Sequence, residues 1–250
     1  MNLIVELQYF PPVILYKNLS KLSNIVFERC EYYQKMSFRN RCQVAGGEGL
    51  INLSVPLVKG RDQKTLMKDV RISDLQPWQD RHWKTLVSCY SRSPWFEFYR
   101  DDLEVLYKRP FELLVDWNRA CFEWTLWVLK MPVPVSLTGE YRKEYDGNEW
   151  VDWRGKILPK NRKGGAGYPG NGSVGDGESY PGNESVGVGE GYYPGNELVG
   201  AGEGCTEDGP VLKYRQVFEE RIGFIPNLSI LDLLFCEGVA AGMLLRGEGV

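Results

Sequence analysis

The sequence predicts an α/β fold in which a short mixed or parallel sheet from the N-terminal third is followed by a helical bundle. A disordered glycine-rich insertion interrupts this fold. Three observations lead to the prediction: residues 3–28 read as strand, helix and strand, residues 77–130 carry apolar side chains at helical spacing, and 16 of the 46 residues in 164–209 are glycine. A chain of 250 residues is long enough to bury a core.

The N-terminal segment predicts a βαβ unit. Residues 3–7 are an apolar strand, residues 13–22 place apolar side chains on one side of a helix, and residues 24–28 form a second strand. Strands joined by a helix are expected to pair in parallel. Gln8 and Tyr9 then follow the first strand at the carboxyl edge, where open α/β sheets bind ligands. Gln8 has an equal alternative as a turn residue that caps the helix.

The middle of the chain predicts a hairpin and three helices. Residues 42–44 and 50–55 flank a Gly-Gly-Glu-Gly turn, and residues 70–72 are a candidate for one more strand. The helices are expected at 77–90, at 103–108 with Asp101 and Asp102 as caps, and at 111–130 between prolines.

His82 is the only histidine of the chain, and it lies on the apolar stripe of the 77–90 helix. Two interpretations stay open from the sequence: a core histidine with satisfied hydrogen bonds, or a general acid–base group that titrates near neutrality.

The sequence predicts one domain, formed by residues 1–160 and 210–250, which is interrupted by a flexible acidic insertion at 161–209. The insertion contains three Tyr-Pro-Gly-Asn repeats and too few apolar groups to offset the entropy of ordering. A short element is expected to begin at Tyr214. Ser229 and Asp232 fit a capping box that opens an apolar helix at 230–236, which must dock on the main body.

Composition limits the classes of function. The net charge is −3, but residues 164–209 hold eight carboxylates and no Lys or Arg, so the remainder carries 30 cations against 25 anions. This mild excess favours an anionic small molecule and not nucleic acid. The six cysteines lack metal-site spacing, so we expect no metal and reduced thiols. No secretion signal or membrane span is evident, so we expect a cytoplasmic protein.

Polar and basic side chains concentrate in residues 32–41, between two strand-like segments. Such groups are costly to bury without partners, and neighbouring cations repel one another unless an anion lies among them. The stretch therefore predicts a pocket for a negatively charged ligand, with a basic surface loop as the equal alternative. The candidate ligand-binding residues are Gln8, Tyr9, Tyr33, Lys35, Ser37, Arg39, Asn40 and Arg41.

Several segments together resemble the WbqC-like protein family, in particular the form found in Bacteroidetes. They are Gln8 to Pro12, Tyr33 to Arg41, Trp78 to Trp83 with Ser91 to Tyr99, and Gln216 to Phe235. The resemblance implies an association with O-antigen and other surface-polysaccharide gene clusters, and hence modification of an activated sugar. It implies no catalytic residue.

Three hypotheses for the function remain. The first is a transferase of acyl or aminoacyl type that modifies a nucleotide-linked amino sugar, with Lys35, Arg39 and Arg41 on the diphosphate and His82 as general base. The second is a non-catalytic protein that binds a nucleotide sugar or a partner enzyme of the same pathway. The third is a structural partner protein. A homodimer is possible, and the sequence indicates no particular cofactor.

Overall fold

The computed structural model describes residues 1–17, 19, 22–159 and 211–248. Its principal sheet has four parallel strands in the order β5-β2-β1-β6. The strands are β1 (Asn2–Glu6), β2 (Asn24–Glu28), β5 (Val135–Leu137) and β6 (Trp150–Asp152). The α/β class is therefore confirmed. The sheet does not come from the N-terminal third alone, because both outer strands follow the helices in the chain.

The predicted βαβ unit is present, with β1 and β2 paired in parallel from Asn2↔Asn24 to Glu6↔Glu28. Its helix α1 is Val13–Lys17, shorter than the expected 13–22. The Leu22 N–H donates to the Leu19 carbonyl at 3.0 Å, so the chain already turns toward β2 at that point.

The predicted hairpin is confirmed as β3 (Arg41–Gly46) and β4 (Gly49–Ser54), a separate antiparallel pair. Residues 70–72 form no strand with it. Arg71 and Ile72 make only isolated bridges to Leu113 and Leu57, although Val70 and Ile72 are buried in the core.

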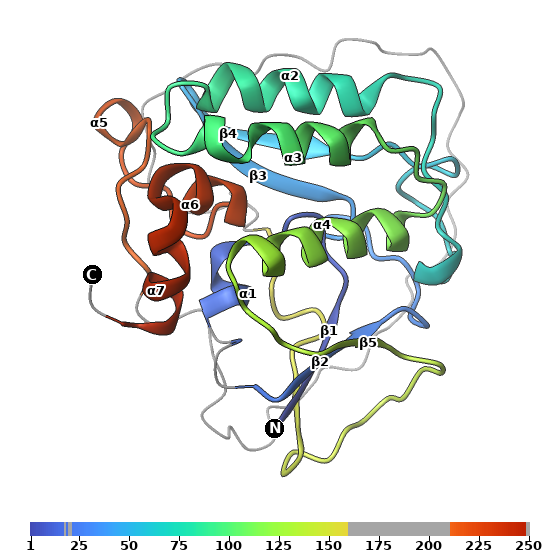
Figure 1. Cartoon of the computed structure of the whole chain (residues 1–250). Helices are drawn as coiled ribbons and strands as arrows, with labels where there is room; N and C mark the ends of the chain where they lie inside the picture. Colours follow the sequence, from blue (N-terminus) through green and yellow to red (C-terminus); the bar gives the residue numbers. More distant parts are fainter. Residues whose placement is uncertain (18, 20–21, 160–210, 249–250) are drawn as a thin grey trace.

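Three helices follow the hairpin: α2 (Trp78–Tyr90), α3 (Phe96–Lys108) and α4 (Leu114–Val128). In Figure 1, α2 and α3 lie together at one end of the molecule, the hairpin lies beneath them, and the parallel strands lie at the other end.

Helix α3 begins earlier than the expected residue 103, so Asp101 and Asp102 lie inside it and do not cap it. The start is set by a tertiary contact. The Trp95 N–H donates to the Phe235 carbonyl at 3.0 Å, and the Phe96 and Phe235 rings pack 5.1 Å apart.

Helix α4 is shorter at both ends than the expected 111–130. Before it, the Glu112 carbonyl accepts from Ile72, which holds the chain in a bridge. After it, Lys130 has a positive φ of 52° and the Met131 N–H returns to the Leu126 carbonyl, which closes the helix end.

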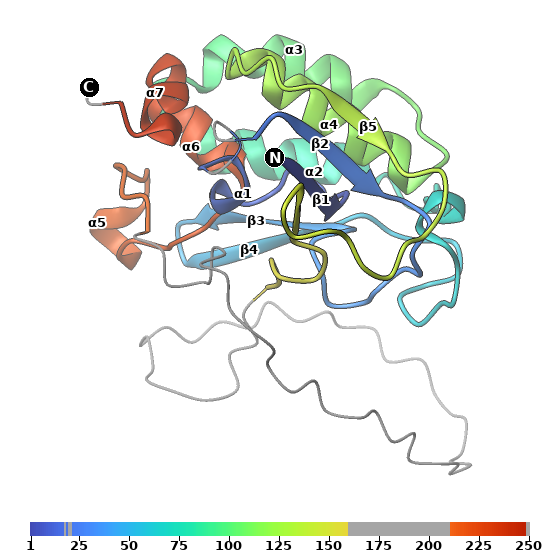
Figure 2. The same ribbon diagram turned by 90° about the horizontal axis from the view of Figure 1, so that it is seen from below.

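The C-terminal part contains α5 (Glu219–Ile222), α6 (Ile230–Glu237), η3 (Gly238–Ala240) and α7 (Ala241–Arg246). Residues 230–235 of α6 are fully buried, which confirms that this helix docks on the main body. In both views α6 and α7 lie beside α1 (Figures 1 and 2). Helix α7 was not among the elements predicted from the sequence.

Two local expectations for this part are confirmed only in part. The element expected at Tyr214 begins only at Glu219, because the Gln216 side chain exchanges hydrogen bonds with the Ile225 backbone and holds the preceding chain extended. The capping box at α6 is half formed. Ser229 accepts from the Leu231 N–H, but the Asp232 carboxylate faces two tyrosines instead.

The core joins the sheet to the helices through aromatic contacts. Phe27 of β2 packs against Phe122 of α4 with ring centroids 4.8 Å apart, and Trp117 of α4 packs against Trp78 of α2 at 5.2 Å. The five cysteines in the described residues are free thiols. No described helix is long and apolar enough to cross a membrane. The predicted insertion at 161–209 lies outside the described residues.

Candidate functional site

Buried acidic residues stand at the carboxyl edge of the parallel sheet. β1 ends at Glu6 and β2 ends at Glu28, the two residues are partners in the register, and both are fully buried. Charged groups are almost never fully buried without a compensating partner or a function. Since open α/β sheets bind ligands at this edge, we take it as the starting point of the site.

Each of these carboxylates is held in place by hydrogen bonds. Glu6 accepts from the Gln8 Nε2 at 2.8 Å and from the Gly155 N–H at 2.9 Å. Glu28 accepts through its Oε1 from the Cys30 N–H and from the Thr138 hydroxyl, both at 2.7 Å. Gln8 and Cys30 follow β1 and β2 directly, whereas Thr138 and Gly155 come from the distant segments after β5 and β6. Together these four residues hold the two carboxylates in fixed positions.

A third acid, Glu31, connects this edge to the basic stretch of the sequence. The guanidinium of the fully buried Arg39 donates to the Glu31 carboxylate, through Nε at 3.0 Å and also through Nη2. Burial raises the pKa of Glu31, and the charges of Glu6 and Glu28 add to this effect while Arg39 opposes it. We call Glu6, Gln8, Glu28, Glu31 and Arg39 the carboxyl-edge cluster.

Arg154 covers one side of the carboxyl-edge cluster. It makes an ion pair with Asp152 at 2.6 Å and donates to the carbonyls of Arg142 and Lys143 at 2.7 and 3.0 Å. Its Nη1 also lies 3.6 Å from the Glu28 carboxylate. The loop between β5 and β6 is thereby fastened over the edge of the sheet.

Three polar atoms of the carboxyl-edge cluster are buried without a hydrogen-bond partner in the part of the chain that the structure describes. They are Gln8 Oε1, Glu28 Oε2 and Arg39 Nη1. Leaving a buried donor or acceptor unpaired costs about 1–3 kcal/mol, and more for a charged group. Gln8 Oε1 and Arg39 Nη1 are thus free to bond a polar ligand or ordered water, whereas Glu28 Oε2 already lies 3.6 Å from the Arg154 guanidinium.

Of the predicted ligand-binding residues, Gln8 and Arg39 belong to the carboxyl-edge cluster. The Gln8 side chain donates to Glu6 and does not cap α1. The Arg39 carbonyl also accepts from Asn118 of α4 at 2.7 Å, which fixes the arginine between the sheet and the helices.

Among the other predicted residues of the basic stretch, Tyr33 and Asn40 are paired with each other. The Tyr33 hydroxyl donates to Asn40 at 2.9 Å, and Asn40 donates to the Val55 carbonyl at 3.0 Å. Burial raises the pKa of Tyr33, whereas the charges of Arg41 and Arg39 lower it, so both cations are close to this hydroxyl.

The remaining members of the stretch face outward or serve its turn. Lys35 pairs with the exposed Asp62, and the Ser37 hydroxyl donates to the Gln34 carbonyl at 2.7 Å. Arg41 donates to the Met36 sulfur at 3.9 Å and lies near the Tyr33 hydroxyl, and its Nε is buried without a hydrogen-bond partner among the described residues. Arg41 thus has no ion-pair partner among the described residues, whereas the ion pair of Lys35 is exposed.

Tyr9 and His82 lie together in the core. The buried Tyr9 hydroxyl is 3.0 Å from His82 Nδ1 and 2.6 Å from the Tyr107 hydroxyl. Burial lowers the pKa of His82 to about 4, and a hydrogen bond to the Ser54 backbone opposes this effect. Because that bond favours the charged ring, the ring donates to the Ser54 carbonyl, so both nitrogens are used inside the protein. This geometry agrees with the core interpretation of His82; its catalytic role stays a prediction.

The sequence interpretation missed most of the acidic residues of the site. A signal was present, because the first two strands both end in glutamate, Val5-Glu6 and Phe27-Glu28. Parallel pairing in register places such residues side by side. No signal pointed to Asp152 or Arg154, since the strand that ends at Asp152 is only three residues long and Arg154 follows it.

The fold and the site define an α/β protein with a buried acidic cluster at the carboxyl edge of its sheet. Residues 8–160, more than half of the chain, match the model of the WbqC-like protein family, and the chain belongs to this family. The match includes every member of the carboxyl-edge cluster except Glu6. Comparisons with curated proteins and with solved structures gave no match. Among the described residues, no group of three or more His, Cys, Asp or Glu side chains has the geometry of a metal site.

Proposed function

We propose that this protein is a cytoplasmic transferase of acyl or aminoacyl type that modifies a nucleotide-linked amino sugar in the biosynthesis of O-antigen or another surface polysaccharide. The observation that carries the proposal is the carboxyl-edge cluster, in which buried charged groups keep polar atoms unpaired at the edge where sheets of this class bind ligands. The pathway comes from the gene clusters with which the resemblance associates the family.

The charge of the site suits the amino sugar end of such a substrate. Glu6, Glu28 and Glu31 stand against Arg39 and Arg154, so carboxylates are in excess. Carboxylates accept hydrogen bonds from sugar hydroxyls and from an amine, and Gln8 Oε1 provides one more acceptor. The charge is less suitable for the diphosphate. In this proposal the diphosphate contacts Arg41 and Lys35 at the margin of the cluster.

Glu31 is the general base of the proposed reaction. Burial and the neighbouring acids raise its pKa. A raised carboxylate pKa lies closer to neutral pH, where a general base exchanges protons efficiently. The amine nitrogen of the sugar forms a bond to the acyl carbonyl carbon, the bond from that carbon to the donor's leaving group breaks, and Glu31 accepts the amine proton.

A non-catalytic binding protein of the same pathway is the second candidate. The observation that favours it is the position of His82, whose two ring nitrogens are both used inside the core and whose pKa of about 4 leaves it neutral at pH 7. In that case the carboxyl-edge cluster binds the sugar and no group is transferred.

The first experiment is thermal unfolding of the protein with nucleotide-linked amino sugars, with the corresponding sugars that lack the amine, and with plain nucleotides. A ligand that binds only the native state raises the Tm. We expect a shift with an amino sugar that is lost in Glu28→Gln and kept in Glu97→Gln, the same exchange at an exposed position on α3. Absence of a shift with every compound would contradict both candidates.

Turnover separates the two candidates. A sugar that gives a thermal shift is incubated with acyl-CoA and aminoacyl donors, and the mass of the sugar is followed. The transferase proposal expects a mass increase that Glu31→Gln abolishes while the thermal shift remains. Binding without any mass increase would instead favour the non-catalytic protein.

A further inference from the structure

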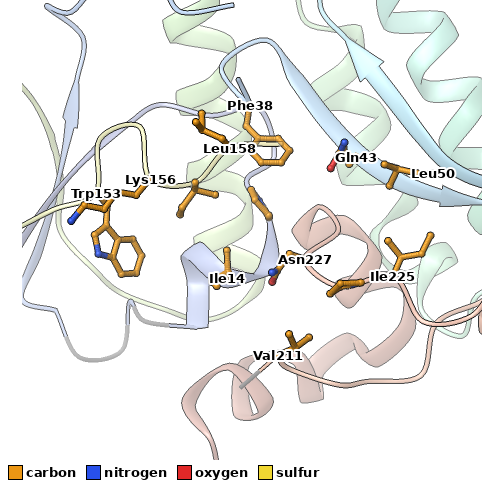
Figure 3. A pocket seen from close by; sticks show the side chains of 13 residues that line it. Ile14, Phe38, Gln43, Leu50, Trp153, Lys156, Leu158, Val211, Ile225 and Asn227 are labelled. Atoms are coloured by element: carbon orange, nitrogen blue, oxygen red, sulfur yellow. The ribbon is translucent and has the colours of Figure 1, made fainter. Parts of the chain in front are cut away.

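A cavity of about 220 Å³ lies beside the carboxyl-edge cluster and takes no part in it. Its walls come from α1, the β3–β4 hairpin, the segment after β6, and the C-terminal segment before α6. Figure 3 shows the side chains of Ile14, Phe38, Gln43, Trp153 and Asn227 around this space.

The backbone around the cavity is fixed by hydrogen bonds between segments that are distant in the sequence. The Val13 N–H donates to the Leu228 carbonyl at 3.0 Å, and the Ser229 N–H donates to the Gln43 carbonyl at 2.7 Å. Ser229 also bridges to Pro12, which lines the cavity. The cavity is therefore formed before any ligand arrives, which reduces the entropy that binding must overcome.

The lining is mostly apolar and carries three polar side chains. These are Gln43, Lys156 and Asn227; no described carboxylate lines the cavity. Lys156 forms no ion pair, and the Asn227 amide forms no hydrogen bond, with any residue that the structure describes. Such a lining matches a ligand with an apolar body and a carbonyl or carboxylate oxygen at one end.

The cavity and the carboxyl-edge cluster share two stretches of chain. Phe38 lines the cavity and Arg39, the next residue, belongs to the cluster. Lys156 lines the cavity, and the N–H of the preceding Gly155 binds Glu6. A group seated in the cavity is thus held next to a ligand on the cluster.

We propose that this cavity binds the short aliphatic acyl group of the donor, with the acyl oxygen toward Lys156 and the amides. The inference rests on the proposed function, since it assigns the second substrate of that transfer. The volume of the cavity is suited to a small group such as a short acyl chain. Pockets for larger ligands usually occupy about 300–1,000 Å³, so a whole nucleotide sugar does not fit here.

Titration calorimetry of the full chain with acetate, butyrate, hexanoate and octanoate tests the cavity without any sugar. We expect the affinity to rise about fourfold with each added methylene until the cavity is full, as burial of a CH₂ requires. Lys156→Gln is expected to weaken hexanoate binding at least fivefold and to leave 1-hexanol binding unchanged. Affinities that do not depend on chain length would overturn the proposal.

Cavity-filling variants locate the binding. Leu50→Trp places an indole in the cavity and is expected to reduce hexanoate affinity more than tenfold, whereas Leu75→Trp is the same exchange at a residue that is 91% exposed and is expected to change nothing. Ile225→Phe fills the cavity from another wall and serves if Leu50→Trp does not fold. Hexanoate binding that survives both filling variants would place it elsewhere on the protein and overturn the proposal.

Failure of the acyl-cavity proposal can be distinguished from failure of the proposed function. If hexanoate binds the cavity but no nucleotide sugar binds the carboxyl-edge cluster, the acyl site stands and the sugar assignment falls. If the filling variants remove the sugar-induced thermal shift as well as hexanoate binding, the two ligands share one site and the assignment of the cavity to the donor is wrong.

Discussion

Glu6 and Glu28 lie directly opposite one another across the parallel strands β1 and β2, and both side chains are fully buried. Two like charges at this spacing repel one another, and burial weakens their hydration. The protein compensates with oriented donors: Gln8 and Gly155 for Glu6, and Cys30 and Thr138 for Glu28. This arrangement gives the first prediction.

Truncation of Glu28 is expected to be far more costly than its neutralisation. Glu28→Ala leaves the Cys30 N–H and the Thr138 hydroxyl without an acceptor, which lowers the free energy of unfolding by about 2–4 kcal/mol. Glu28→Gln keeps the Oε1 acceptor and removes the repulsion with Glu6, so we expect a change within about 1 kcal/mol. Urea unfolding at pH 7 measures both. Equal losses in the two variants would contradict the assigned hydrogen bonds.

The Arg39–Glu31 pair predicts a strong dependence of one residue on the other. Arg39→Met leaves Glu31 buried without its cation, and breaking such a pair lowers the free energy of unfolding by about 3–5 kcal/mol. Glu31→Gln in the same chain is expected to restore part of this loss. The matched control is Lys35→Met, whose partner Asp62 is exposed and whose loss should not be measurable. Additive effects of Arg39→Met and Glu31→Gln would show that the two side chains are not coupled.

His82 predicts that acid destabilises the protein. Its pKa is about 4 in the folded protein and about 6.5 in the unfolded chain, so the unfolded chain binds the extra proton between these values. The free energy of unfolding should therefore fall as the pH decreases from 6.5 to 4, by up to about 3 kcal/mol. Urea unfolding across this range, compared between the wild type and His82→Gln, isolates the effect because the chain has no other histidine. If the free energy of unfolding of His82→Gln depended on pH as that of the wild type does, the prediction for His82 would be contradicted.

Asp232 is expected to affect the free energy of unfolding with the opposite sign over nearly the same pH range. It is buried and accepts from the hydroxyls of Tyr90 and Tyr214, and burial raises its pKa to about 6, while the two hydrogen bonds oppose this shift. The folded protein then holds a proton that the unfolded chain has released, so this residue's stabilising contribution is lost as the pH rises from about 4 to 6. Asp232→Asn removes the contribution. We expect its stability to decrease more steeply toward low pH than that of the wild type.

Arg154 predicts a local effect on the loop between β5 and β6. It donates to the carbonyls of Arg142 and Lys143, and it lies over the rings of Tyr141 and Tyr145. Arg154→Ala is expected to accelerate amide hydrogen exchange in residues 141–146 and to leave exchange in α4 unchanged, because that helix is stabilised by the core. Faster exchange throughout the protein would instead indicate a global loss of stability.

An element is well predicted from the sequence when interactions between neighbouring residues form it, and poorly predicted when contacts with distant residues decide its ends. The hairpin and the α2 helix follow the sequence pattern closely, because a turn signal and a regular apolar stripe act over neighbouring residues. The start of α3 and the end of α4 differ from the pattern, since contacts with Phe235 and the return bond from Met131 decide them. β5 and β6 are three residues each, too short to carry a period.

The candidate site shows the same division. The sequence alone indicated that Gln8 follows a strand at the edge of a sheet and that Arg39 belongs to a basic stretch, because strand ends and cation density are local properties. It also indicated the α/β class and the parallel β1–β2 pair. Only the tertiary structure decided that Arg39 faces Glu31, that Glu6 and Glu28 are both buried, and that Arg154 approaches Glu28 from the segment after β6. Arg154 and Glu28 are far apart in the sequence, and electrostatic pairing and burial depend on distance in space, which the local pattern of a chain does not contain.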